Sequence, residues 1–291
     1  MIDRGDLDGA EAKLREALAI RRKVMGPGHP DLAISLNNLG YVLLEKGDWR
    51  DAEPVLKENL DINLQRLGAA NPRLASPLNN WARVLEAKGD YAQAEQYYTR
   101  ALTVLAQANA GSTWAAAQIT ANVGLLHFDR GEYAQAEQWA RQAMEMRRAL
   151  GGDGTPALAT SLIEVGVDRE FEGDVRGAIP LLRSALEIRR KKLWPGHPAI
   201  LTAEVRLGEG LVAEGNAAEA EPLLKEASAA AKKEPFALPA WQIGEADNAY
   251  AECLISLGRA AEADGLREAS IAALKSDPRP AFRTGVVFPR H

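Results

Sequence analysis

The chain has 291 residues, of which 46% are hydrophobic and 26% charged, and its formal net charge of −5 gives no bulk attraction to a nucleic-acid backbone. No stretch approaches 18 uninterrupted apolar residues, and the N-terminal MIDRGDLDGA lacks the basic-then-apolar order of a secretion signal, so we expect neither a membrane span nor export. The single cysteine, Cys253, cannot form an internal disulfide, which fits a cytoplasmic location.

Glycine recurs along the chain with a fixed spacing of 42 residues, and an alanine follows each glycine five residues later. The series consists of Gly5, Gly47, Gly89, Gly131, Gly173 and Gly215, continued one residue late by Gly258. A fixed period of this length indicates stacked structural repeats. Such a solenoid grows one unit at a time and has no single central core.

The segment 30–67 serves as the model repeat. In its first half leucines recur at steps of three and four residues, which predicts a helix that begins near Pro30 and ends at a left-handed Gly47. The second half predicts another helix, capped by Asp48. We expect Ala52 where the two helices cross, because a larger side chain there would push them apart. Each repeat is thus predicted to be two antiparallel helices.

Three second helices contain a proline two residues after the crossing alanine, at Pro54, Pro180 and Pro222. Because proline removes a backbone hydrogen bond, we expect a late helix start or a mild bend there.

The repeats predict one solenoid over residues 1–275, with about six full helix pairs and a partial pair at the N-terminus. The first repeat lacks nearly all of its first helix, so the uncapped edge should expose Leu7, Leu14 and Leu18 and could self-associate. The missing helix indicates either that the chain is part of a longer protein or that its gene start is misplaced. The prolines of 276–291 stop the helical pattern and predict a C-terminal tail.

One sequence pattern resembles a known family. The order Leu36-x2-Leu39-Gly40-x2-Leu43, followed by Ala52-x3-Leu56, resembles the tetratricopeptide repeat with leucines in place of aromatic residues. The 42-residue length and the phrases SLNNLG, DWRDAEPVLKENL and GPGHPD are similar to the kinesin-light-chain type. The resemblance weakens at 110–118 and 231–245. It implies an all-α fold, a right-handed α-solenoid of antiparallel helix pairs whose concave groove binds a peptide or partner protein.

No arrangement of residues indicates catalysis, a metal or a cofactor, so we expect no enzyme activity. His29 and His197 hold the same turn position four repeats apart, which predicts capping rather than a shared site. The carboxylates that follow the crossing alanines are expected on a solvated face, without raised pKa values. Basic runs at 21–23, 147–148 and 189–192 end second helices and are expected to form an exposed ridge.

Asparagines provide the one specific signal for a site. Asn38, Asn80, Asn122 and Asn248 share a first-helix position, which Glu164 and Arg206 interrupt, while Asn37 and Asn79 double it. Asparagine is a mediocre helix former, so its repeated use needs a reason. One hypothesis is hydrogen bonding between adjacent first helices. The other, implied by the resemblance, is capture of the main chain of an extended peptide. The neighbouring groove candidates are Tyr41, Arg83, Leu125, Phe128 and Phe171.

Two functions remain open. The first is an interaction scaffold that binds a protein or peptide partner, and not nucleic acid or membrane. The second is a regulatory or sensor arm of a larger enzyme, such as a bacterial kinase or ATPase, whose catalytic domain lies outside this chain.

Overall fold

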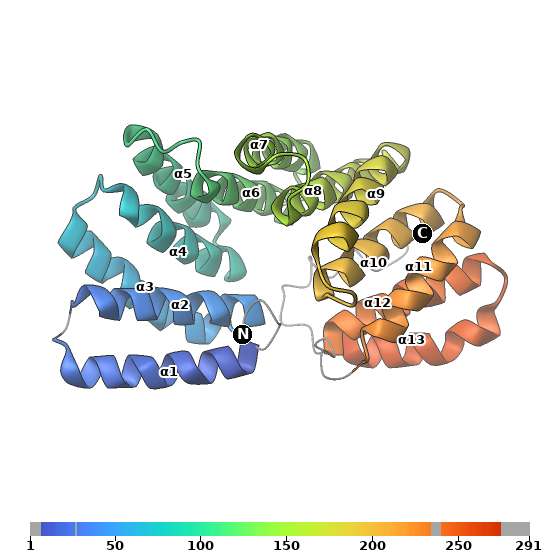
Figure 1. Ribbon diagram of the computed structural model, residues 1–291, viewed down its shortest axis with the longest axis horizontal. Helices are drawn as coiled ribbons and strands as arrows, with labels where there is room; N and C mark the ends of the chain where they lie inside the picture. The colour runs from blue at the N-terminus through green and yellow to red at the C-terminus, as the bar shows by residue number, and fades with distance from the viewer. Residues whose placement is uncertain (1–6, 27, 234–239, 275–291) are drawn as a thin grey trace. The chain divides into compact units, whose positions relative to one another are not determined.

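The computed structural model describes residues 7–26, 28–233 and 240–274, and these residues form helices with no strand among them (Figure 1). A helix α1 (Leu7–Val24) is followed by pairs of a first and a second helix. The first helices are α2 (Pro30–Lys46), α4 (Ala75–Ala87), α6 (Trp114–Asp129), α8 (Pro156–Glu172), α10 (Pro198–Ala213) and α12 (Ala240–Ser256). The second helices are α3 (Trp49–Leu67), α5 (Tyr91–Gln107), α7 (Tyr133–Gly151), α9 (Val175–Lys192), α11 (Ala217–Ala230) and α13 (Ala260–Leu274).

The all-α repeat fold predicted from the sequence is confirmed. The chain divides into two compact units, one up to Arg130 and the other from Gly131 onward. Inside the units, α2 packs on α3, α4 on α5, α8 on α9, α10 on α11 and α12 on α13. First helices of adjacent repeats also pack on one another, as α2 does on α4 and α8 on α10. None of the helices in the described segments is long and apolar enough to cross a membrane.

Helix ends follow the local sequence. Gly47 ends α2 with a φ of 82°, a left-handed conformation that favours glycine. His29 Nδ1 accepts a hydrogen bond from the Asp31 backbone N–H at 3.2 Å, and His197 Nδ1 accepts one from Ala199 at 3.0 Å, so the capping role of both histidines is confirmed. Asp48 differs from its prediction, because it precedes α3 without a side-chain capping bond.

The prolines inside second helices do not delay the helix starts. Helix α3 begins at Trp49 and runs past Pro54, and α9 and α11 likewise begin before Pro180 and Pro222. The prediction of a late start is therefore wrong. The N–H that proline lacks would lie in the second turn, and the remaining backbone bonds keep the helix continuous.

The predicted helix crossings are confirmed. Five alanines at crossings inside one unit are fully buried, namely Ala52, Ala94, Ala178, Ala220 and Ala263. The first helix α2 also needs a small residue where it meets α3, because a Cβ atom added to Gly40 would overlap the Leu56 side chain. Small residues on both partners thus let the two helices of a repeat approach closely.

Helix α1 packs on α2, and this contact changes the prediction for the N-terminal edge. Leu18 is only 7% exposed, and Leu7 and Leu14 are half-buried, so the expectation that all three lie open is wrong. The large apolar side chains that α1 does expose are Ile20 and Val24. The predicted tail, 276–291, lies outside the described residues.

Ion pairs connect successive repeats. The repeating carboxylates expected on a solvated face instead bind cations near the ends of the following first helices or just beyond them. The pairs are Glu11–Lys46, Glu53–Lys88, Glu95–Arg130, Glu137–Arg169 and Glu221–Arg259. The expectation of unraised pKa values holds for Glu11 and Glu137, where bonded cations lower the carboxyl pKa.

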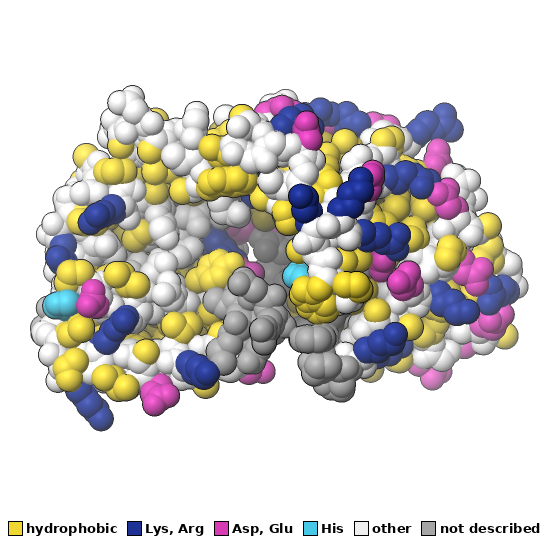
Figure 2. Space-filling view, viewed as in Figure 1, with side chains coloured by type: hydrophobic (Ala, Val, Ile, Leu, Met, Phe, Trp, Pro, Cys, Tyr) yellow, Lys and Arg dark blue, Asp and Glu magenta, His cyan; other side chains and the backbone are white. Residues whose placement is uncertain are grey.

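The basic runs are only partly an exposed ridge. Arg147 and Arg189 are buried, because Arg147 Nη1 donates to Ser161 Oγ at 2.5 Å and Arg189 Nη1 donates to the Ala199 carbonyl at 2.6 Å. These bonds attach second helices to the next first helices. On the face in Figure 2, the Lys and Arg side chains that remain exposed gather over the second unit, many of them beside Asp or Glu.

Candidate functional site

The predicted asparagines of the first unit form a continuous chain of hydrogen bonds across three first helices. Asn80 Nδ2 on α4 donates to Asn37 Oδ1 on α2 at 3.0 Å, and Asn79 Nδ2 donates to Asn80 Oδ1 at 3.2 Å. Asn122 Nδ2 on α6 donates to Asn79 Oδ1 at 2.8 Å, and its own Oδ1 accepts from Gln118. We call Asn37, Asn79, Asn80 and Asn122 the amide row.

Burial separates the members of this site. Asn79, Asn80 and Asn122 are 8%, 4% and 6% exposed, Asn37 is half-buried, and Asn38 is exposed. Asn38 lies beside the amide row and takes no part in its hydrogen bonds, although it shares the sequence position of Asn80 and Asn122. The hypothesis of bonding between repeats accounts for the buried members, while capture of a peptide main chain stays a prediction.

Four of the predicted neighbours lie on the same first helices. The Arg83 guanidinium on α4 stands 5.7 Å from the ring centre of Tyr41 on α2, and its Nη2 bonds Glu45 Oε1 at 2.9 Å. Leu125 on α6 is 37% exposed, whereas Phe128 is half-buried. This face therefore presents an aromatic ring, an ion-paired guanidinium and an exposed leucine. Such mixed polarity is typical of a peptide-binding surface.

The second unit carries charges where the first carries asparagines. At the asparagine position, Glu164 Oε2 on α8 lies 3.2 Å from Arg147 Nη1, and Arg206 Nη1 on α10 lies 2.8 Å from Glu209 Oε2. Two predicted site residues also belong to this unit. Phe171 is half-buried with its ring 5.0 Å from that of Tyr133, and Asn248 is half-buried on α12.

Two acidic residues of α8 were not singled out by sequence reasoning. Asp168 is buried at the position that holds Val42, Val84 and Leu126 in earlier repeats. Burial, reinforced by the nearby carboxylate of Glu164, raises the pKa of Asp168 to about 8. Burial likewise raises the pKa of Glu170 to about 8. The repeat period was the signal that could have identified Asp168, since an acid there departs from an apolar position.

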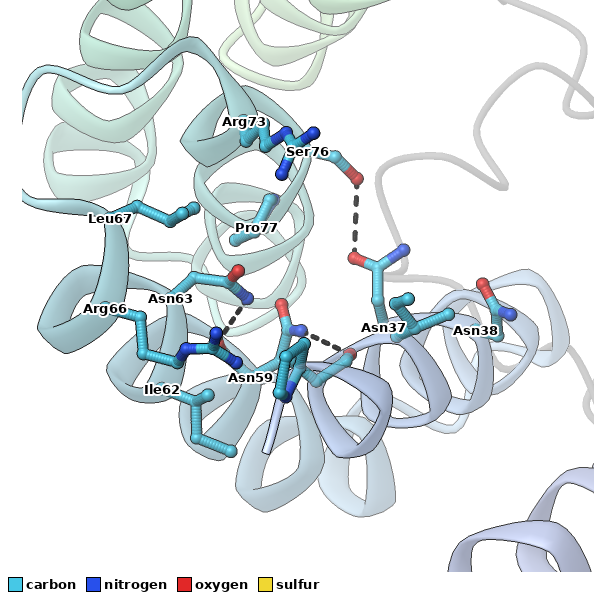
Figure 3. A pocket seen from close by; sticks show the side chains of 13 residues that line it. Asn37, Asn38, Asn59, Ile62, Asn63, Arg66, Leu67, Arg73, Ser76 and Pro77 are labelled. Atoms are coloured by element: carbon cyan, nitrogen blue, oxygen red, sulfur yellow. Dashed lines mark hydrogen bonds between the residues drawn. The ribbon is translucent and has the colours of Figure 1, made fainter. Parts of the chain in front are cut away.

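A cavity of about 510 Å³ lies between α2, the end of α3 and the start of α4 (Figure 3). Asn37 and Asn38 line it from α2, and Asn59 and Asn63 line it from α3. Its apolar lining consists of Pro30, Ala33, Ile34, Ile62, Leu67 and Pro77. Sequence reasoning placed Asn37 and Asn38 at a site but missed the residues contributed by α3.

The described residues contain no group of three or more His, Cys, Asp or Glu side chains placed to hold a metal ion. The first unit instead offers amides, one cavity and open side chains on neighbouring helices. Such an arrangement can hold a partner by hydrogen bonds and apolar contact.

The family model described as tetratricopeptide repeat matches residues 2–65, 34–107, 73–149 and 115–191. The chain belongs to the tetratricopeptide-repeat family. This confirms the family that the sequence pattern indicated. Tetratricopeptide-repeat folds are in general non-catalytic scaffolds that bind protein or peptide partners.

Solved tetratricopeptide-repeat structures share the fold at low identity. A Podospora anserina protein assigned as a kinesin light chain with nearly identical TPR-like repeats is 21% identical, with a TM-score of 0.57, over 71% of this chain and 99% of that chain. A Rap protein complexed with Competence and Sporulation Factor is 14% identical, with a TM-score of 0.63, over 96% and 86%. Comparison with curated proteins gives no match.

A third solved structure is a multidomain one. It is a signal-transduction ATPase with numerous domains from Pyrococcus horikoshii, which carries a tetratricopeptide-repeat sensor. This chain is 15% identical to it, with a TM-score of 0.65, over 88% of this chain and 37% of that chain.

Proposed function

We propose that the chain is a protein–protein interaction scaffold whose first-helix face binds an extended peptide segment of a partner. The observation that carries the proposal is the amide row, which connects α2, α4 and α6 on one face beside Tyr41 and Leu125. Membership of the tetratricopeptide-repeat family supports it, and so does the fold shared with a Rap protein complexed with Competence and Sporulation Factor.

The amide row can serve the partner and the repeats at once. Each asparagine Nδ2 carries two hydrogens, and in Asn79, Asn80 and Asn122 one of them is used in the row. The second hydrogen can be donated to a carbonyl oxygen of a bound main chain. The exposed amide of Asn38 adds a donor and an acceptor at the edge of the row.

We propose a cytoplasmic binding protein without catalysis or cofactor, formed by a solenoid over 1–275 and a tail over 276–291. The burial of Arg147 and Arg189 supports a partner other than nucleic acid, because these arginines hold helices together. The exposed Ile20 and Val24 of α1 are the surface through which self-association would occur.

A second function is favoured by one comparison. The similarity to the tetratricopeptide-repeat sensor structure covers 88% of this chain but 37% of that longer one. We propose as the alternative that this chain is the sensor arm of a larger enzyme. Sequencing the genomic DNA on both sides of this coding sequence distinguishes the two functions. The alternative requires a catalytic domain encoded in the same open reading frame.

The scaffold function is tested by selecting short random peptides on the whole chain and titrating the best binders. We expect saturable binding that Leu125→Asp weakens about tenfold or more, since a charge enters an apolar contact surface. Ile271→Asp is the matched control, because Ile271 is also exposed but lies on a second helix of the other unit. Equal binding by both variants, or no selectable peptide at all, would reject the proposed face.

A further inference from the structure

Asn59 breaks the repeat pattern inside the cavity of the first unit. The same second-helix position holds an alanine in five other repeats, at Ala17, Ala101, Ala143, Ala185 and Ala227. Asn59 is 1% exposed, and its Nδ2 donates to the Ala33 carbonyl at 2.7 Å. Its Oδ1 is buried and has no hydrogen-bond partner among the described residues. A buried polar atom without a partner disfavours folding, so the repeat retains an asparagine where alanine would fold better.

The unpaired oxygen points into the middle of the cavity, between Asn63 and Asn37 (Figure 3). The group that completes this site must therefore be a hydrogen-bond donor. A lysine or arginine of a partner is disfavoured, because Arg66 and Arg73 line the same cavity with like charge. The donors that remain are neutral ones.

A carboxamide matches the lining better than a hydroxyl does. It donates through its NH2 group and accepts through its oxygen, so it can pair with an amide in both directions. Asn63 Nδ2 uses one hydrogen to bond the Asn59 carbonyl at 2.8 Å and keeps a second one for an acceptor. The amide side chains at the cavity therefore complement an asparagine or glutamine of a bound segment.

The two arginines give the cavity a second preference. Arg66 Nη1 donates to the Gly28 carbonyl at 3.3 Å, but neither Arg66 nor Arg73 has an ion pair within the described residues. Four other arginines of the first unit, Arg15, Arg22, Arg83 and Arg130, do have carboxylate partners. A carboxylate beside the inserted carboxamide would find both guanidiniums available.

We propose that this cavity is a specificity subsite that receives an asparagine or glutamine side chain of the bound peptide, with Asp or Glu as a near neighbour in the peptide. Asn59 Oδ1 accepts from the inserted NH2 group, and Arg66 and Arg73 bind the neighbouring carboxylate. The subsite rests on the proposed peptide-binding function and names the kind of segment that the first unit prefers.

The test uses a display library of short random peptides selected on the whole chain, on Asn59→Ala, and on Arg66→Gln with Arg73→Gln. We expect the unmodified chain to enrich Asn or Gln at one peptide position and Asp or Glu close to it. Asn59→Ala should lose the carboxamide preference and bind the selected peptides roughly fivefold or more weakly, while the double arginine variant loses the acidic preference. Gln96→Ala and Arg176→Gln are matched controls on exposed helix faces and should change neither.

The outcomes separate the subsite from the general function. Because alanine is the residue of the other repeats, Asn59→Ala should fold at least as stably as the unmodified chain, which thermal unfolding checks. Peptides that bind Asn59→Ala as well as the unmodified chain, yet are weakened by Leu125→Asp, overturn the subsite and leave the peptide-binding face intact. Enrichment of hydroxyl or apolar residues at the position sensitive to Asn59 also overturns the carboxamide assignment. Failure to select any peptide overturns both proposals.

Discussion

Asn122 on α6 donates a hydrogen bond from Nδ2 to Oδ1 of Asn79 on α4 across 2.8 Å, and both side chains are more than nine-tenths buried. The bond joins first helices of adjacent repeats at a place where solvent cannot replace it. We therefore expect the more deeply buried members of the amide row to contribute more to the free energy of folding. Asn38, at the exposed edge, is the residue whose contribution to binding can be measured apart from stability.

The first prediction compares Asn38→Ala with Asn80→Ala. Asn80 bonds both Asn37 and Asn79 and is buried, so its removal leaves polar partners unsatisfied at a cost of about 1–3 kcal/mol. Asn38→Ala should change the free energy of unfolding by less than about 0.5 kcal/mol, as is usual for an exposed site. If the face binds a peptide main chain, Asn38→Ala should weaken that peptide several-fold. Urea unfolding and titration with a selected peptide measure the two quantities. Unchanged affinity for Asn38→Ala would leave the asparagines as structural contacts only.

The second prediction concerns pH and the buried acid of α8. Because burial raises the pKa of Asp168 to about 8, the folded unit holds a proton that the unfolded chain releases near the ordinary value of 3.8. The folded state binds more protons between these two values, so its stability should fall as pH rises from about 4 to about 8. Glu170, with its pKa also raised to about 8, acts in the same direction.

Two substitutions isolate the contribution of Asp168. Asp168→Val restores the apolar residue of earlier repeats and should raise the melting temperature at pH 8 and reduce the slope of stability against pH. Asp168→Asn keeps a polar side chain but removes the titration, so it should reduce the slope as well. Asp264→Asn, on the exposed side of α13, is the control and should leave the slope unchanged. A slope as steep in Asp168→Val as in the unmodified chain would mean that the Asp168 carboxyl does not contribute to the pH dependence.

The third prediction tests the helix crossing. Ala94 on α5 has no exposed surface, so Ala94→Leu must displace neighbouring atoms and should cost about 1–3 kcal/mol of folding free energy. Ala92→Leu introduces the same side chain on the exposed side of the same helix and should be close to neutral. Thermal unfolding of both variants gives the comparison. Equal melting temperatures would show that the crossing has room to spare.

Periodic features of the fold could be predicted from the sequence because their physical causes are local and recur. The glycine that ends α2, the alanines at the crossings and the histidine caps each depend on a few neighbouring residues. The bonding partners in the amide row were harder to predict. Asn80 bonds Asn37 rather than its sequence counterpart Asn38, because the rotation of each helix decides which of two adjacent side chains turns toward the neighbour.

The features that sequence reasoning missed are departures from the repeat. Asn59 replaces an alanine and Asp168 replaces an apolar residue, and in each case the consequence depends on burial and on groups distant in the sequence. Glu53 follows the repeat pattern, yet its role also depends on a residue distant in the sequence. Its charge suggested a solvated face, but the packing of the next repeat brings Lys88 to it. The repeat pattern in the sequence identifies such positions, but the residues that pack against each of them determine its role.

The last prediction compares two adjacent arginines of α7. Arg147 is 4% exposed and bonds Ser161 and Glu164 of α8, while the Arg148 side chain is 40% exposed and pairs with Glu145 and Asp153. Removing Arg147 leaves Glu164 without its cation in a partly buried setting, which for a buried pair costs about 3–5 kcal/mol. Arg148→Ala breaks only screened surface pairs, worth about 0–1 kcal/mol.

The two variants therefore differ in their response to salt as well as in stability. Arg147→Ala should lower the urea midpoint of the second unit strongly at any ionic strength, because solvent ions do not reach the buried bonds. The small effect of Arg148→Ala should shrink further as salt is added. Both remove one positive charge from neighbouring positions of one helix, so net charge and helix propensity are matched. Similar midpoints for the two variants would contradict the buried contact between α7 and α8 and return Arg147 to the exposed ridge that the sequence suggested.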